Sequence, residues 1–160
     1  MAAKVSTTRI NARPHWTALL RESQGATVDR IALVRAGVPA AQLPALVEAL
    51  ALPTASVLDA LQIARTSLAR RIAQHSVLAP DESERVVGLL ALIGQVARML
   101  QDSGVHESLA VPQAARWLGA WLAAANNALG GETPLSYLDT AEGRNLVSRL
   151  LGAMEAGTYW

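Results

Sequence analysis

Apolar residues recur along most of this chain at the spacing of a helix with one buried stripe, and no stretch sustains the alternation of a half-buried strand. The apolar positions are mainly Ala and Leu, and phenylalanine is absent. Both observations favour helices, so we predict an all-α fold. In the first third of the chain the pattern predicts short helices over residues 14–21, 27–36 and 44–50.

Residues 54–75 have the spacing of a helix-turn-helix, with a first helix over 54–61, a three-residue break and a second helix over 65–74. In the second helix Leu68 and Ile72 lie one turn apart, and we expect them to face inward. The outer face then carries Arg65, Thr66, Ser67, Arg70, Arg71 and Gln74. Hydroxyls at a helix start and arginines along it suit a reader of the DNA major groove, because the first residues reach base edges and the cations meet phosphates. The spacing fits a solvated, arginine-rich face of a helical bundle equally well.

The longest apolar run, Val86–Leu100, lies on a predicted helix that begins at Pro80, where the acids that follow suit the positive end of the helix dipole. Polar residues interrupt the run, and it is shorter than the ~20 residues that a spanning helix needs, so we predict no membrane segment. A helix apolar over so much of its circumference is either a central core helix or a contact between subunits. We favour a homodimer formed through this face, with Leu92 and Val96 in the interface.

Another helix is expected to begin at Pro112, after a break at residues 102–104. Its predicted buried stripe consists of Ala114, Trp117, Leu118, Trp121, Leu122 and Ala125. The two tryptophans lie one turn apart, a spacing that indicates core packing more often than an exposed stack for a ligand. We expect this helix to join the helix-turn-helix module to the C-terminal module.

The stretch Asn126–Trp160 carries the most specific pattern in the chain. A double glycine at 130–131 marks a turn that needs positive φ, and a Thr-Pro pair at 133–134 begins a short helix. A cap at Thr140 opens a final helix that ends at Gly157. The apolar stripe of this final helix consists of Leu146, Val147, Leu150, Leu151 and Met154.

The order of these pieces resembles the toxin-binding domain of the Xre/MbcA/ParS antitoxins. The resemblance rests on Leu-Gly-Gly-x-Thr-Pro-Leu-x-x-Leu-Asp-Thr-x-x-Gly from Leu129 and on Leu-Leu-x-x-Met-Glu-x-Gly-x-Tyr from Leu150. Upstream, Arg-Thr-x-Leu-Ala-Arg-Arg from Arg65 and Ala-Pro-Asp-Glu-Ser-Glu-Arg from Ala79 are similar to the Xre-type helix-turn-helix that precedes this domain in the family. One departure is at the turn between the two helices, where the family commonly has a glycine and this chain has Gln62.

The resemblance implies an Xre-like helix-turn-helix bundle followed by a small helical toxin-binding domain. We accordingly expect a flexible arm over residues 1–13, a helical domain over 14–103 that contains the helix-turn-helix, and a C-terminal domain over 104–160. The function implied is that of an antitoxin in a type II toxin-antitoxin pair. In this family the usual toxin has a RES domain that attacks NAD or transfers ADP-ribose, the antitoxin's C-terminal segment obstructs the toxin's active site, and the helix-turn-helix binds the operon's own promoter.

The toxin contacts are expected in the last helix and in the tail that follows it. In the family the region after the last helix enters the toxin's pocket, which implies that Tyr159 and Trp160 contact the toxin. Arg144 and Arg149, on the polar face of the last helix, are further expected contacts. The alternative is a tail folded back on the two tryptophans of the preceding helix.

Composition limits the other functions open to the chain. Its 160 residues are 51% apolar and 17% charged with a net charge of +1, so it can bury a core and any contact with nucleic acid must be local. A net charge this small favours two helix-turn-helix units acting together in a homodimer. Without cysteine the chain forms no disulfide and no thiolate metal site, which suits the reducing cytoplasm where we expect it.

The sequence offers no catalytic or metal-binding motif. His15, His75 and His106 each lack a second ligand at i+3 or i+4. There is no Gly-x-Ser-x-Gly elbow, phosphate loop or dinucleotide fingerprint, and the acids are spread over helix surfaces. We therefore predict no enzyme activity, cofactor or metal. The alternative to an antitoxin is a helix-turn-helix transcriptional regulator whose C-terminal domain only dimerises.

Overall fold

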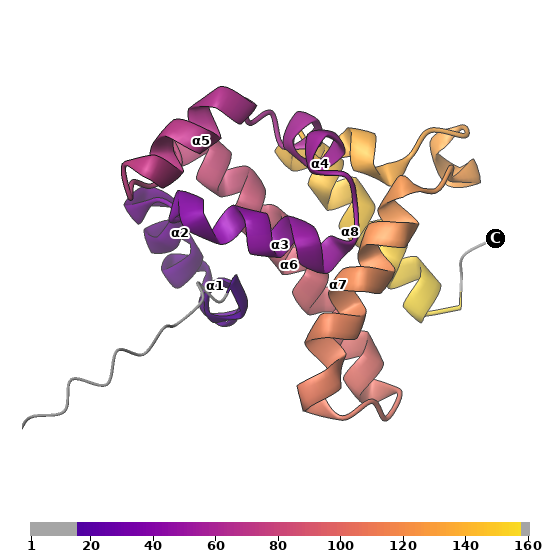
Figure 1. Ribbon diagram of the computed structural model, residues 1–160. Helices are drawn as coiled ribbons and strands as arrows, with labels where there is room; N and C mark the ends of the chain where they lie inside the picture. Colours follow the sequence, from indigo (N-terminus) through magenta and orange to yellow (C-terminus); the bar gives the residue numbers. More distant parts are fainter. Residues whose placement is uncertain (1–15, 158–160) are drawn as a thin grey trace, which may run out of the picture.

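The computed structural model describes residues 16–157, and these residues form helices joined by short turns (Figure 1). The α-helices are α1 (Trp16–Ser23), α2 (Thr27–Ala36), α3 (Leu43–Leu50), α4 (Thr54–Ala60), α5 (Arg65–Ala73), α6 (Pro80–Asp102), α7 (Glu107–Ala123) and α8 (Ala141–Glu155). Short 3-10 helices lie at η1 (Ala40–Gln42), η2 (Asn127–Leu129) and η3 (Pro134–Tyr137). The only extended pairing within these residues is an isolated bridge between Pro39 and Val77. The predicted all-α fold is confirmed, and the predicted arm over 1–13 lies outside the described residues.

The helices of the N-terminal half lie where the apolar pattern predicts them. The predicted stripe of α3 is buried along its whole length and comprises Leu43, Leu46, Val47 and Leu50. α2 is different, because none of its residues is buried and Val28 is 73% exposed. α2 therefore contacts the core along one narrow side, and most of its surface is exposed to solvent.

No single helix within residues 16–157 combines the length and apolar character that crossing a membrane requires. Only Ala40–Leu50 and Thr54–Ala60 taken together reach that composition, and the chain bends by 116° between them.

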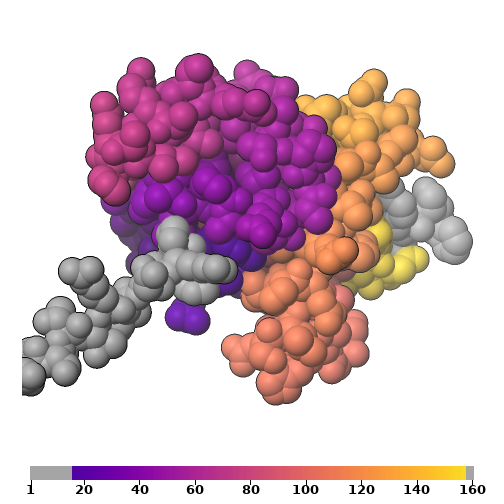
Figure 2. Space-filling model, in the orientation of Figure 1, coloured from indigo at the N-terminus to yellow at the C-terminus, as the bar shows by residue number. Residues whose placement is uncertain are grey.

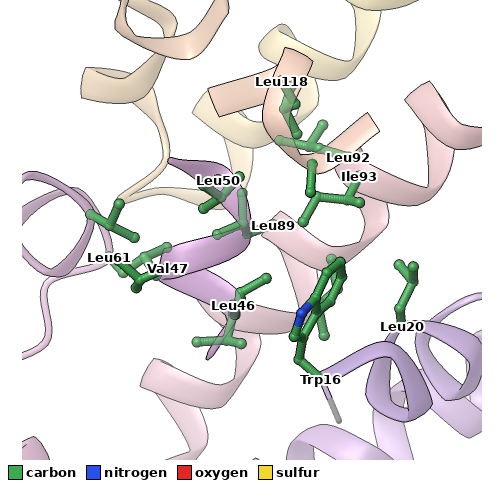
Figure 3. Close-up of a cluster of buried hydrophobic side chains, with 14 of the residues drawn as sticks. Trp16, Leu20, Leu46, Val47, Leu50, Leu61, Leu89, Leu92, Ile93 and Leu118 are labelled. Atoms are coloured by element: carbon green, nitrogen blue, oxygen red, sulfur yellow. The ribbon is translucent and has the colours of Figure 1, made fainter. Parts of the chain in front are cut away.

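α6 is the central helix of the fold, and α1, α2, α7 and α8 all pack against it. In Figure 1 it crosses the molecule behind α3. Figure 3 shows side chains of α6 gathered with leucines of α3 and α7 and with Trp16 of α1. The buried apolar residues of α6 are Val86, Val87, Leu89, Leu90, Leu92, Ile93, Val96 and Ala97. Each neighbouring helix covers a different part of the α6 circumference, so almost all of its apolar surface is removed from water.

The wide apolar face of α6 is thus the core of one chain, and the hypothesis that it forms a subunit contact is wrong. Leu92 is 3% exposed and Val96 is 2% exposed. The sequence pattern is the same in both cases, because a helix apolar on most sides can be covered by helices of its own chain or by a second copy. A homodimer must therefore use another surface.

α7 begins at Glu107, five residues before the predicted start at Pro112, which lies inside the helix. The side chain of His106 caps this start, since its Nδ1 atom accepts a hydrogen bond from the backbone N–H of Ser108 at 3.3 Å. A histidine is not among the residues ordinarily expected at this position. In the sequence the proline is therefore the stronger signal, and the predicted helix start is five residues too late.

The rotation of α7 about its own axis is fixed by Gly119. A Cβ atom at this position would lie 1.9 Å from the carbonyl oxygen of Leu50, so only glycine allows α7 to approach α3 this closely. The other buried residues of α7 are Ala110, Ala114, Ala115, Leu118 and Leu122. The predicted stripe was partly right, but Trp117, which is 40% exposed, and Ala125 lie outside the core.

The turns and caps of the C-terminal part are those that the sequence predicts. Gly130 and Gly131 adopt φ angles of 67° and 91°. The Thr140 hydroxyl accepts a hydrogen bond from the Gly143 N–H at 3.0 Å and so caps α8, and Gly157 follows the helix with a φ of 66°. Within the predicted stripe of α8 the fully buried residues are Val147 and Leu151.

Replacing Leu92 by Glu tests the position of the α6 face. The buried carboxylate would have no partner, so we expect Leu92→Glu to lower the free energy of unfolding by about 3–5 kcal/mol. Urea unfolding followed by circular dichroism measures this change. Val28→Glu, at an exposed position of α2, is the control and should change stability by less than about 0.5 kcal/mol. A stable, folded Leu92→Glu monomer would instead mean that the face lies at a subunit contact.

Candidate functional site

The turn between α4 and α5 forms without the glycine that the family commonly has there. Gln62 adopts a φ of 53°, in the left-handed region, and its Nε2 atom donates a hydrogen bond to the Asp59 carbonyl at 2.9 Å. The N–H of Ile63 donates to the Leu58 carbonyl at 2.9 Å, and the Ile63 side chain is buried. These bonds offset the cost of a non-glycine residue in this conformation. The predicted helix-turn-helix arrangement is therefore present.

Arg85 of α6 holds this turn in place, although the sequence analysis gave it no role. Its Nε atom donates to the carbonyl oxygen of Leu61 at 2.6 Å, and its Nη2 atom contacts Asp81 Oδ2 at 3.0 Å. The hydrogen bond from Arg85 lowers the pKa of the Asp81 carboxyl below its usual value. Arg85 thus binds the free carbonyl at the end of α4 and fixes α4 to the first turns of α6.

The outer face of α5 presents most of the predicted DNA-binding residues to solvent. Arg65, Thr66 and Arg70 are exposed, and Ser67 is partly exposed. Leu68 faces inward and is 7% exposed. Figure 2 shows α5 on the surface of the molecule, at the edge away from α7 and α8. Cations and hydroxyls are therefore available together on one helix face.

Arg71 is an exception, and the prediction that it lies on the outer face is wrong. Its guanidinium forms an ion pair with Glu82 of α6, and only 19% of the Arg71 side chain and 11% of the Glu82 side chain are exposed. The same Glu82 oxygen accepts a hydrogen bond from the backbone N–H of Ala79 at 2.9 Å. Position 71 therefore faces the first turn of α6, where Glu82 lies. Arg71 is consequently a structural link between α5 and α6.

Arg144 is also a structural residue, and the prediction that it lies on the polar face of the last helix is wrong. Its side chain is 9% exposed and donates hydrogen bonds to the Leu138 carbonyl at 2.9 Å and to Glu84 of α6 at 3.0 Å. Burial lowers the pKa of the Arg144 guanidinium, and the nearby Glu84 carboxylate opposes that shift. Gly88 makes room for this side chain, since a Cβ atom there would lie 2.5 Å from Arg144 Nε. Arg144 therefore joins α8 to α6.

One of the residues that we predict to contact the toxin, Arg149, is exposed on α8. Next to it, Ser148 faces α6: Gln95 of α6 donates to the Ser148 carbonyl at 3.0 Å and accepts from the Ser148 hydroxyl at 2.8 Å, which orients α8 on α6. The other two predicted contacts, Tyr159 and Trp160, lie outside the described residues.

Comparison with known proteins identifies the family. Residues 29–91 match the antitoxin Xre-like helix-turn-helix domain, and residues 110–157 match the antitoxin Xre/MbcA/ParS C-terminal toxin-binding domain. A relative from Sphingobium sp. (strain YBL2), named Prs ADP-ribosylating antitoxin, is 36% identical over 132 residues, which cover 82% of this chain and 81% of the relative. The chain belongs to the Xre/MbcA/ParS antitoxin family. It is the antitoxin of a toxin-antitoxin pair, with a helix-turn-helix domain and a cognate toxin as its partner, and it is not an enzyme.

The two matched parts of the antitoxin share one hydrophobic core. The first match ends at residue 91, inside α6, and the second begins at residue 110, inside α7. A single cluster of buried apolar side chains runs from Trp16 in α1 to Leu151 in α8. The boundary that we predict between residues 103 and 104 coincides with the turn between α6 and α7, and it stays a prediction.

The antitoxin also exposes a tryptophan that the sequence analysis assigned to the core. Trp117 stacks on Trp121 with ring centroids 6.2 Å apart and an angle of 10° between the ring planes. Trp121 is partly buried. A glycine two residues from each tryptophan was the available signal, because it marks the opposite face of α7 as the side of close helix packing.

The described histidines of the antitoxin lie at helix ends. His106 caps α7, and His75 follows α5 with a φ of 51°. Among residues 16–157, no three side chains of the types that bind metals lie close enough together to hold an ion.

Alanine variants of Arg144 and Arg149 test which of these two arginines of α8 stabilises the fold. We expect Arg144→Ala to lower the free energy of unfolding by about 1–3 kcal/mol, because the Leu138 carbonyl loses its donor. Arg149→Ala should change it by less than about 0.5 kcal/mol, since that side chain is exposed. Urea unfolding of both variants measures the difference. Equal stability of the two variants would contradict the structural role of Arg144.

Proposed function

We propose that this antitoxin neutralises a RES-type toxin, which consumes NAD or transfers ADP-ribose, by obstructing the toxin's active site with its own C-terminal segment. The observation that carries the proposal is the match of residues 110–157 to a toxin-binding domain. The name of the Sphingobium relative, Prs ADP-ribosylating antitoxin, supports ADP-ribose transfer as the toxin's chemistry.

The toxin contacts that we propose lie at the end of the chain. Arg149 offers an exposed cation on α8, and Tyr159 and Trp160 follow within a few residues. Tyrosine and tryptophan are frequent interface anchors because each buries a large, rigid surface while its polar atom finds a hydrogen bond. Gly157 follows α8 with a left-handed conformation, and Tyr159 comes two residues later in the sequence.

We propose further that the antitoxin acts in the cytoplasm and that its α5 binds the promoter of its own operon. The exposed Arg65 and Thr66 stand at the start of α5, where residues of a recognition helix meet base edges, and Arg70 stands one turn further on, where it can meet phosphates. With a net charge of +1, one helix-turn-helix binds DNA weakly, so the functional unit in this proposal is a homodimer on two half-sites. Its interface lies away from the buried face of α6.

The DNA proposal is tested by gel shift on the native promoter and on unrelated DNA. Arg65→Ala should weaken promoter binding by about 1–3 kcal/mol and relax the choice of sequence, because a base contact is lost. Arg70→Ala should weaken binding to both DNAs alike, because a phosphate contact carries no sequence information.

Two further variants serve as controls for this experiment. Arg21→Ala, at an exposed position of α1, should leave DNA binding unchanged. Arg71→Ala should lower stability, since it breaks the ion pair with Glu82. Unchanged promoter binding by both Arg65→Ala and Arg70→Ala would remove α5 from the DNA interface.

The inhibitory role of the tail is tested by a chain that ends at Ala156. Because α8 is complete at Glu155 and its buried residues all precede that point, the shortened chain should keep its circular dichroism spectrum and its DNA binding. It should nevertheless fail to protect cells that express the cognate toxin. Protection is measured as colony survival beside the full-length antitoxin. Full survival with the shortened chain would show that the tail is not the inhibitory element.

A further inference from the structure

The outer side of α7 is unusually apolar for a helix face in contact with solvent. After the first turn its exposed positions are Pro112, Gln113, Arg116, Trp117, Ala120 and Ala123, a set that we call the α7 outer face. Only one of these residues is charged. A solvent-facing helix side ordinarily carries several charged residues, and an exposed apolar area that contains a large aromatic side chain indicates a binding surface.

The packing of α7 against α3 contributes to the exposed position of Trp117. Gly119 contacts the backbone of α3 at Leu50, and two residues of an α-helix differ by about 200° around its axis. Trp117 therefore points away from the side that packs against α3, as does Trp121, which lies equally far from Gly119 and is only partly buried. To bury Trp117 against the chain's own core, α7 would have to rotate and lose the close contact at Gly119.

Trp117 also stacks on a neighbouring side chain, a contact that favours one orientation of its ring. Its ring lies nearly parallel to that of Trp121, with 6.2 Å between the centroids, and Trp121 packs against the core. A side chain that is already ordered loses little conformational freedom when it is covered. Tryptophan is one of the residue types enriched among the strong anchors of protein interfaces.

We infer that the α7 outer face binds the cognate toxin, with Trp117 as the central anchor. The inference rests on the proposed function, in which the C-terminal domain binds a toxin, and the face lies inside the matched toxin-binding region, residues 110–157. Arg116 makes no ion pair within the described residues, so the matching toxin surface is an apolar patch with a carboxylate at its edge. This contact adds affinity beside the tail that obstructs the active site.

A second copy of this chain fits the α7 outer face less well than the toxin does. In a symmetric contact the same surface meets itself, so the two Arg116 side chains would enter one interface. The face has no acidic residue to pair with them. Like charges brought together without a partner weaken association, whereas a toxin surface with a carboxylate strengthens it.

The test measures the affinity of the full-length antitoxin for the purified product of the reading frame adjacent to its gene, by titration calorimetry. Trp117→Ala should weaken binding about thirtyfold, the loss typical of an interface anchor. Ala120→Glu, which adds a charge to the same face one turn away, should weaken binding at least tenfold. Val28→Ala, an exposed apolar position on α2, is the matched control and should bind like the wild type. Circular dichroism and promoter binding of all three variants should equal those of the wild type.

The possible outcomes separate this inference from the proposed function. If folded Trp117→Ala and Ala120→Glu bind the toxin with wild-type affinity, the inference that the α7 outer face binds the toxin is wrong, whereas the proposed function stands. If Trp117→Ala converts a dimer to a monomer and leaves toxin affinity unchanged, the α7 outer face contacts a second copy of the chain. That result would also contradict the inference. If the wild-type antitoxin does not bind this protein, both the inference about the α7 outer face and the proposed function are wrong.

Discussion

Near the start of α6, Glu82, Glu84 and Arg85 bind partners on both sides of the helix. Glu82 pairs with Arg71 of α5, and Arg85 binds the turn after α4. Glu84 pairs with Arg144 of α8. These contacts are directional, and they add to the non-directional burial of the apolar residues that follow along α6. The helix-turn-helix and the last helix are consequently fixed to one common element.

Small residues determine how closely the other helices approach this centre. Gly119 lets α7 meet the backbone of α3, and Gly88 lets the Arg144 side chain cross the surface of α6. Alanines occupy much of the buried side of α7, which keeps that helix close to its neighbours. Close packing of this kind leaves few alternative rotations for a helix, because a change would place backbone atoms in contact with side chains. Side chains on the helix faces opposite these close contacts are therefore exposed to solvent.

In the function that we propose, the antitoxin uses separate faces for separate partners. α5 presents arginines and hydroxyls at one edge of the molecule, whereas Arg149 and the outer side of α7 belong to the part matched as toxin-binding. Both parts share one core, so neither surface can shift far without disturbing α6. The DNA contact and the toxin contact that we propose therefore use different surfaces of one rigid core.

Several features of the antitoxin were determined by the sequence alone. Local rules suffice for the helices, since periodicity, caps and glycines act within one or two turns, and they predicted the buried stripe of α3, the double-glycine turn and the cap at Thr140 correctly. The family resemblance also came from the sequence, because the order of turn residues near the C-terminus is specific. The outward positions of Arg65, Thr66 and Arg70 followed from the inward position of Leu68.

Tertiary structure alone decided which partner each amphipathic or charged side chain meets. Arg70 and Arg71 are neighbours in sequence. Arg70 is exposed, whereas Arg71 forms an ion pair with Glu82, eleven residues away on another helix. Arg144 reaches Glu84 across sixty residues, and no local pattern distinguishes it from the exposed Arg149. Likewise, the tryptophans of α7 suit a core or an interface equally well by periodicity. Their position depends on the contact between Gly119 and Leu50, which forms only when α7 and α3, distant in sequence, pack together.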